Sequence, residues 1–274
     1  MMVMDLGLDE PGARERLFVV LEEIRQLGQQ IDDVAADPEI WHRPGSKIGR
    51  LIADLPEPHV DVRRTMACAV SGLRGALDTV STLITSGVPT SPESLAILCR
   101  TALLASCRLL VLVGPDDVEQ ARENTLRVMM QESRSLGHLY RRAAEFKRLR
   151  ALVPPRQVIE LHERRHAELQ AEGKRAFTEI EMVELAADVV GDMMRAAGGE
   201  EEEHATTRSE HLVWIFNTYS GVSHAFAWPT MVAGTTNRLP GDFVADLGTT
   251  VAVAGMAVYA FLKAAEERGD DDVD

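Results

Sequence analysis

The chain of 274 residues is poor in the residue types that hold small or all-β proteins together. Its three cysteines (Cys68, Cys99 and Cys107) form no CxxC pair, so neither a disulfide framework nor a cysteine zinc knuckle is expected. Aromatic residues make up only 5% of the chain, which argues against a β-sandwich or barrel, because strands favour aromatic and β-branched side chains. The P-loop, GxGxxG and GxSxG motifs are absent, which argues against the enzyme classes that use them.

Positive charge is also scarce: the chain has 29 Lys and Arg but 43 Asp and Glu, and its formal net charge is −14. Nucleic-acid binding requires clustered Lys and Arg, and anionic membranes repel an acidic protein. We therefore expect no DNA or membrane partner, and the same charge disfavours RNA. The N-terminal residues lack the apolar run of a secretory signal, so the expected compartment is the cytoplasm.

Apolar residues recur at helical spacing along most of the chain. Ser91 is placed to cap a helix with Pro92 in its first turn, Thr178 and Glu181 form a capping box, and Pro229 is expected to end a helix. A polar break is expected at 198–204. The predicted helices span 12–36, 60–85, 95–113, about 117–150, 156–172, about 179–197, 209–227 and 243–267, with a short helix in the loop 38–58.

These elements predict an all-α, multi-helix bundle of about eight helices around a buried central helix near 95–113, which is apolar on nearly all sides. We expect residues 1–57 to form an N-terminal arm, 58–267 the main bundle and 268–274 a disordered acidic tail. The helices near 95–113 and 243–267 are interpreted as core helices rather than membrane spans. Apolar stripes on the first two long helices leave room for a homodimer or a protein partner.

The segment His162-Glu-Arg-Arg-His166 is an HExxH motif on a predicted helix. Its spacing places two imidazoles on one helix face with Glu163 beside them, an arrangement suited to zinc and a general base. With Glu184 as a third ligand, the segment resembles the gluzincin metalloprotease pattern. The two middle arginines depart from that pattern, and a solvated helix with Glu–Arg pairs is the alternative. A zinc-dependent hydrolase is therefore one hypothesis; otherwise we expect no cofactor.

A second candidate site combines Arg100 with a late helix that carries Tyr219, Ser223 and His224. A guanidinium on so apolar a helix must pair with a carboxylate or bind an anion. A buried histidine near hydroxyl groups is either a base or a hydrogen-bonded core residue. Our first hypothesis is a binding or assembly protein with a small interior polar pocket lined by these four residues; an internal ion pair of Arg100 is the alternative.

Several short motifs resemble a group of uncharacterised, all-helical actinobacterial proteins. They are Arg100 in an Ala- and Leu-rich helix, the break Leu112-Val-Gly-Pro-Asp-Asp117, an Arg-rich helix, and Tyr219-Ser-Gly-Val-Ser-His224. Leu104 stands where that group is expected to have Glu, and Ala225 where it is expected to have Gly. The resemblance implies a helical fold and no particular function.

The HEPN ribonucleases are recognised by a motif of Arg, then four to six residues, then His. Arg156 and His162 fit this spacing, and a metal-independent ribonuclease of a defence system with His162 or His224 as its base is a further hypothesis. The basic stretch from Arg134 to Arg150 has two interpretations. It is a patch that binds RNA or an acidic partner, or it is a solvated helix end whose charge suits the helix dipole.

Overall fold

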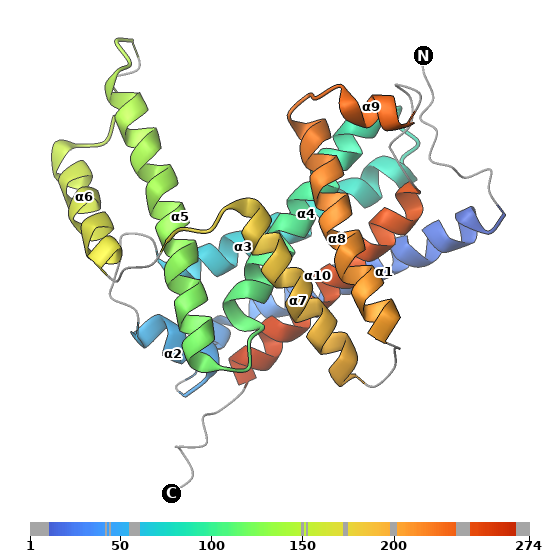
Figure 1. Cartoon of the computed structure of the whole chain (residues 1–274), viewed down its shortest axis with the longest axis horizontal. Helices are drawn as coiled ribbons and strands as arrows, with labels where there is room; N and C mark the ends of the chain where they lie inside the picture. Colours follow the sequence, from blue (N-terminus) through green and yellow to red (C-terminus); the bar gives the residue numbers. More distant parts are fainter. Residues whose placement is uncertain are drawn as a thin grey trace, which may run out of the picture.

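The computed structural model describes residues 11–41, 43, 45–54, 61–148, 151, 153–171, 175–197, 202–233 and 242–266. Its elements are α1 (Ala13–Ala36), η1 (Pro38–Trp41), α2 (Lys47–Asp54), α3 (Val62–Thr85), α4 (Pro92–Val113), α5 (Val118–Ala144), α6 (Arg156–Ala171), α7 (Glu179–Ala196), α8 (Glu202–Ser223), α9 (Trp228–Ala233) and α10 (Phe243–Glu266). Figure 1 shows their arrangement. Over the described residues the protein is all-helical, and since α2 and α9 are short, the prediction of about eight helices is confirmed.

Local hydrogen bonds explain why several helices begin where the sequence predicts. The side chain of Ser91 accepts from the backbone N–H of Ser94, and Pro92 occupies the first turn of α4. Thr178 and Glu181 form the predicted capping box at the start of α7. Such caps satisfy backbone donors that have no partner inside the helix, which is why these starts can be predicted from sequence.

Three predicted helix boundaries are wrong. The helix α8 begins at Glu202, inside the polar break predicted for 198–204, and it ends at Ser223. Pro229 does not end a helix but lies in the first turn of α9, where a missing N–H is tolerated. The helix α5 ends at Ala144, before the basic stretch is complete. Residues 198–201 and the predicted tail 268–274 lie outside the described residues.

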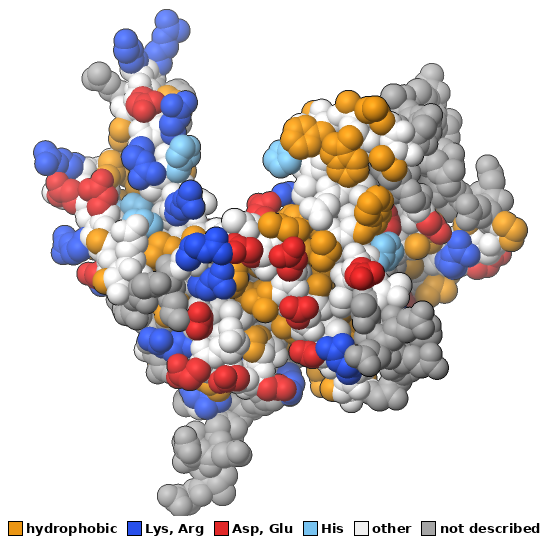
Figure 2. Space-filling view, in the orientation of Figure 1, with side chains coloured by type: hydrophobic (Ala, Val, Ile, Leu, Met, Phe, Trp, Pro, Cys, Tyr) orange, Lys and Arg blue, Asp and Glu red, His pale blue; other side chains and the backbone are white. Residues whose placement is uncertain are grey.

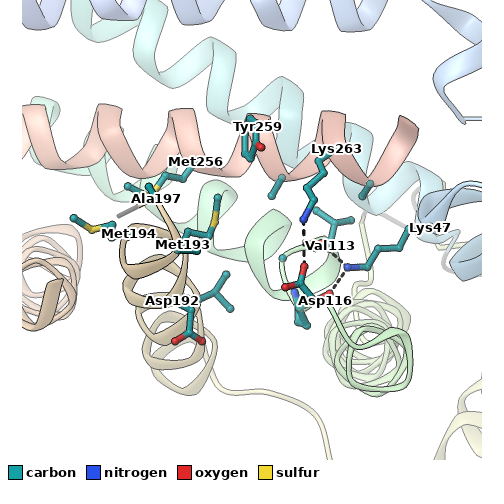
Figure 3. Close-up of a pocket in the computed structure, with 16 residues that line it drawn as sticks. Lys47, Val113, Asp116, Asp192, Met193, Met194, Ala197, Met256, Tyr259 and Lys263 are labelled. Carbon is teal, nitrogen blue, oxygen red and sulfur yellow. Dashed lines mark hydrogen bonds and ion pairs between the residues drawn. The ribbon is translucent and has the colours of Figure 1, made fainter. Parts of the chain in front are cut away.

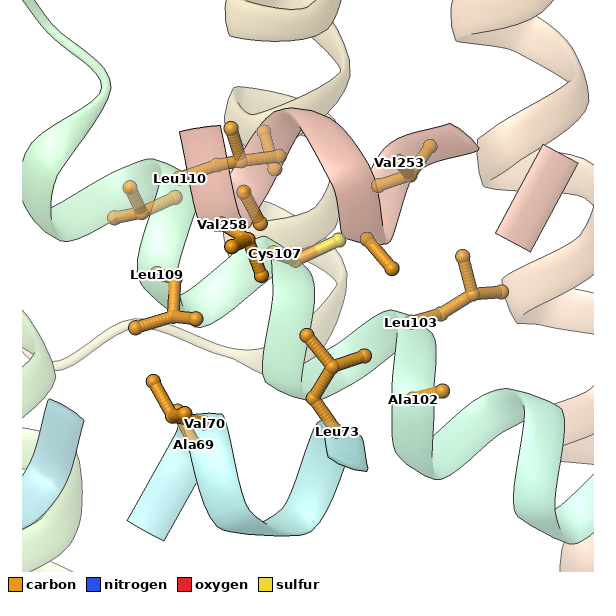
Figure 4. Close-up of a cluster of buried hydrophobic side chains, with 14 of the residues drawn as sticks. Ala69, Val70, Leu73, Ala102, Leu103, Cys107, Leu109, Leu110, Val253 and Val258 are labelled. Carbon is orange, nitrogen blue, oxygen red and sulfur yellow. The ribbon is translucent and has the colours of Figure 1, made fainter. Parts of the chain in front are cut away.

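The helix α4 is the centre of the bundle, as predicted. It lies between α3 and α10 (Figure 4) and also packs against α5, α7 and α8. Leu103, Cys107 and Leu110 are fully buried, and Figure 4 shows them between side chains of α3 and α10. Burial of an apolar side chain contributes about 1.5–3 kcal/mol, so this helix organises the fold.

The segment predicted as an N-terminal arm shares this core in its described part. Leu17, Ile24 and Ile31 of α1 are buried, and α1 packs against α10 and α3. The helix α2 lies against α10, α5 and α3. The division into an arm and a main bundle stays a prediction.

The helices α5 and α6 form a hairpin that projects from the rest of the molecule (Figure 1). Among its substantial contacts, α6 packs only against α5. Figure 2 shows a deep hollow between this α5–α6 hairpin and the end of the molecule formed by α8 and α9. The hairpin therefore offers an extended surface that the central core does not cover.

We expect one rapidly reacting thiol in the folded protein. Cys68 is exposed on α3, whereas Cys99 and Cys107 are fully buried on α4. Burial raises the pKa of Cys107 to about 12 and raises the pKa of Cys99 still further, so neither supplies thiolate at neutral pH. A colorimetric thiol assay at pH 8 should find one thiol per native chain and three in denaturant. Fast reaction of two or more native thiols would contradict the packing of α4.

Candidate functional site

Arg100 of α4 is held by neighbours on two other helices, α7 and α8. Its Nε donates to Ser220 Oγ at 2.8 Å and its Nη2 donates to Glu179 Oε2 at 2.5 Å. The guanidinium carbon lies 5.2 Å from the centre of the Phe216 ring, and the side chain is 16% exposed. The positive charge of Arg100 is thus paired with the carboxylate of Glu179, as in the ion-pair alternative stated above. This ion pair joins α4 to α7.

Tyr219, fully buried on α8, has its partner on another helix. Its hydroxyl donates to Asp246 Oδ2 of α10 at 2.9 Å, and burial followed by the charge of Asp246 raises its pKa well above the usual value. His211 Nε2 lies 2.9 Å from Asp246 Oδ1, and His211 Nδ1 lies 3.2 Å from Thr249 Oγ1. This partly buried network joins α8 to α10.

The other two residues of the predicted interior pocket lie at the end of α8. Ser223 Oγ donates to the carbonyl of Ser220 at 2.9 Å, and His224 is exposed with its ring 5.7 Å from that of Phe226. Arg100 and Ser223 thus share Ser220 as a partner, whereas Tyr219 and His224 contact other residues. Neither of the two cavities described below is lined by the four predicted side chains.

Asp246 and His211 were not among the predicted site residues. The signal in the sequence was one carboxylate within an otherwise apolar helix, since Phe243, Val244 and Leu247 surround Asp246. A buried carboxylate needs hydrogen-bond partners, and this one has two on α8. The sequence could indicate that need but not the partners that meet it.

The two histidines of the HExxH motif lie side by side on α6 against α5. Their rings are stacked with centres 6.1 Å apart, and His166 Nδ1 lies 2.9 Å from Ser133 Oγ. Burial, and next the neighbouring His166, lower the pKa of His162, while Glu163 opposes this shift. Glu163 is exposed on the same helix.

The third metal ligand of that hypothesis, Glu184, is exposed on α7, which has no substantial contact with α6. In the described part of the chain, no three His, Cys, Asp or Glu side chains form a group suited to a metal ion. The two imidazoles alone do not complete the three protein ligands of a catalytic zinc site. The zinc hypothesis stays a prediction, and no chemistry is derived from it.

The larger cavity is a groove of about 550 Å³ between the C-terminal ends of α4 and α7 and the C-terminal half of α10 (Figure 3). Most of its wall is apolar, and Tyr259 at its edge is 61% exposed. Its larger apolar side chains are Val113, Val189, Met193, Met194, Met256 and Tyr259. We call this cavity the methionine groove.

Two lysines meet at one end of the methionine groove. Lys47 is 3% exposed, and its Nζ donates to the carbonyls of Val113, at 3.0 Å, and Pro115. Lys263 Nζ lies 3.3 Å from Asp116 Oδ1, whose side chain is 93% exposed. Figure 3 shows both lysines directed at the turn between α4 and α5.

Asp192, also on the groove wall, is paired with Arg195 at 2.5 Å. Among the described residues, the lysine end thus holds two ammonium groups and one carboxylate, with Lys47 offsetting the negative end of the α4 dipole.

Comparison with models of protein families, with curated proteins and with solved structures finds no match to this chain. Function must therefore be argued from the cavities themselves. Ligand sites are typically concave, mostly apolar spaces of about 300–1,000 Å³ with a few polar groups that orient the ligand. The methionine groove fits this description in volume and lining.

Proposed function

We propose that this protein is a non-catalytic binding protein that takes a small amphipathic carboxylate in the methionine groove. The observation that carries the proposal is an apolar groove of about 550 Å³ with Lys47 and Lys263 together at one end. An apolar chain would lie along the wall and a carboxylate would lie at the lysines.

The apolar wall supports a flexible, extended ligand. Met193, Met194 and Met256 have unbranched, polarisable side chains that adapt to irregular shapes. Tyr259 offers an exposed ring at the groove edge. Covering these surfaces with an alkyl chain would contribute about 0.8 kcal/mol for each buried CH₂ group, so affinity should rise with chain length.

The lysine end supports a negative head group. The pair between Lys263 and Asp116 is long and exposed on the carboxylate side, and such pairs contribute about 0–1 kcal/mol. A ligand carboxylate can therefore replace Asp116 at little cost. Lys47, already fixed by two carbonyls, adds positive charge behind it without having to move.

The first test is calorimetric titration of the full chain with straight-chain carboxylates of six to twelve carbons and with the matching alcohols. We expect carboxylates to bind more tightly as the chain lengthens. The variant Lys263→Met should lose about tenfold or more in carboxylate affinity, because a hydrogen bond to a charged group contributes about 1.5–3 kcal/mol. Its affinity for the alcohols should be unchanged.

The matched control is Lys147→Met, which removes an exposed lysine that does not line the groove. We expect this variant to bind the carboxylates as the unaltered protein does. The proposal is overturned if no carboxylate binds, if Lys263→Met leaves carboxylate affinity unchanged, or if both lysine variants lose affinity equally.

We also propose a cytoplasmic location. Two observations support it: Cys99 and Cys107 are free and buried, and α4 and α10 are core helices of the bundle. Both helices are long and apolar enough to cross a membrane, but 61% of the most apolar window of each is buried inside the fold. The homodimer stays a prediction, as does the ribonuclease hypothesis. Cleavage of total RNA by the purified protein, lost in His162→Ala, would favour the ribonuclease over the binding protein.

A further inference from the structure

The α5–α6 hairpin is basic in a chain that is otherwise strongly acidic. Between residues 133 and 166 the sequence has nine Lys and Arg against three Asp and Glu, although the net charge of the whole chain is −14. Figure 2 shows Lys and Arg side chains over this hairpin, apart from most of the acidic ones. Such an asymmetry points to an anionic ligand at the hairpin.

A second cavity, of about 210 Å³, lies between the two helices of the hairpin. Polar groups from both helices line it, including Ser133, Arg134, Tyr140 and Arg141 of α5 and His166 of α6. Most of these side chains donate hydrogen bonds, and Glu163 is the only carboxylate in the lining. The cavity is thus suited to an acceptor-rich, negatively charged group.

Gly137 lets the His162 ring of α6 approach the backbone of α5 closely at the floor of this cavity. A Cβ atom there would lie 2.8 Å from His162 Nε2 and 3.6 Å from Arg141 Nη1. Both nitrogens therefore border the same small space above the backbone of α5. A ligand oxygen in that space would meet the guanidinium of Arg141 directly.

The arginines of the cavity differ in their pairing from three other arginines of the hairpin. Arg142, Arg156 and Arg165 are paired with glutamates one turn away, which are Glu145, Glu160 and Glu168. Arg134 and Arg141 have no carboxylate within ion-pair distance among the described residues. Lys147, Arg148 and Arg164, outside the cavity lining, are likewise without a carboxylate at ion-pair distance among the described residues, so part of the unmatched charge of the hairpin lies at the cavity.

We propose that this cavity binds the terminal phosphate of a phosphomonoester, with Arg141, Arg134 and Tyr140 around its oxygens. A guanidinium matches phosphate geometry through two parallel hydrogen bonds. The volume of about 210 Å³ leaves room for part of the esterified group beside the phosphate. The ester is either a small molecule or the 5′ end of an RNA, and both present the same dianion.

Calorimetry of the full chain at constant ionic strength tests this site, with adenosine 5′-monophosphate and adenosine as probes. We expect the monophosphate to bind and adenosine not to bind. The variant Arg141→Gln should lose tenfold or more in affinity. The control Arg142→Gln, one residue along α5 and paired with Glu145, should stay within twofold.

A second variant fills the site instead of removing charge. Gly137→Ala places a methyl group 2.8 Å from His162 Nε2 at the floor of the cavity, so it should displace the His162 ring into the phosphate position and lower affinity tenfold or more, while circular dichroism shows an unchanged helix content. Equal binding of adenosine and its monophosphate would overturn the proposal. Full affinity in Arg141→Gln, or equal losses in Arg141→Gln and Arg142→Gln, would also overturn it.

An RNA arm separates the two sources of the phosphate. A short oligonucleotide with a 5′ phosphate should bind more tightly than the same oligonucleotide with a 5′ hydroxyl if the ligand is an RNA end. If the ligand is a small phosphomonoester, the free monophosphate binds and neither oligonucleotide does. If both oligonucleotides bind equally and Arg141→Gln does not change their affinity, the RNA binds to the basic surface of the hairpin and not in the cavity. That result would overturn the proposal.

Discussion

Replacing Asp246 by alanine is expected to lower the free energy of unfolding by about 2–4 kcal/mol. The substitution removes the acceptor for the Tyr219 hydroxyl and for His211 Nε2, both 2.9 Å from the carboxylate. A buried polar group left without a partner costs about 1–3 kcal/mol. Urea unfolding followed by circular dichroism measures the change.

Two companion variants separate the parts of this network. Tyr219→Phe removes one hydrogen bond and keeps the ring, so we expect a smaller loss, of about 1 kcal/mol. Thr249→Val removes only the contact to His211 Nδ1, at 3.2 Å, and should cost less again. If Asp246→Ala lowers the free energy of unfolding by less than Tyr219→Phe does, Asp246 is not the centre of the network.

Replacing Leu103 by alanine is expected to cost about 3 kcal/mol or more of stability. Leu103 is fully buried on α4, between α3 and α10, where the removed atoms leave a cavity that the surrounding helices cannot close (Figure 4). Leucine-to-alanine changes in such positions cost about 2–5 kcal/mol. Thermal and urea unfolding should both show the loss.

The matched control for this prediction lies on the same helix. Ile97 is a side chain of similar size on the exposed face of α4, and its replacement by alanine should change stability by less than about 1 kcal/mol. Similar losses for Leu103→Ala and Ile97→Ala would mean that α4 is not buried as the structure places it.

The helices were predictable where their signals are local. Ser91 with Pro92, and Thr178 with Glu181, start helices through contacts within four residues, and both starts are confirmed. Pro229 was ambiguous because a proline both ends one helix and suits the first turn of the next. The chain reverses between α8 and α9 through Ala225, whose positive φ of 56° gives no distinct pattern in sequence.

The sites were less predictable because their groups are far apart along the chain. The need of Arg100 for a carboxylate could be deduced, but Glu179, 79 residues away, is chosen by the packing of α4 on α7. Met193 and Met256 have the spacing of ordinary core residues. Whether they are covered or line a groove depends on how α7 and α10 end against α4, which periodicity does not specify.

The methionines themselves provide the most direct test of the central claim, that the methionine groove is the ligand site. Of the eleven methionines, Met193, Met194 and Met256 line it, whereas Met66, Met129 and Met182 are buried elsewhere in the core. In a methyl NMR titration of ¹³C-methionine-labelled protein with dodecanoate, we expect the first three signals to shift saturably and the other three to stay in place. Saturable binding that leaves the three groove signals unmoved would contradict the account.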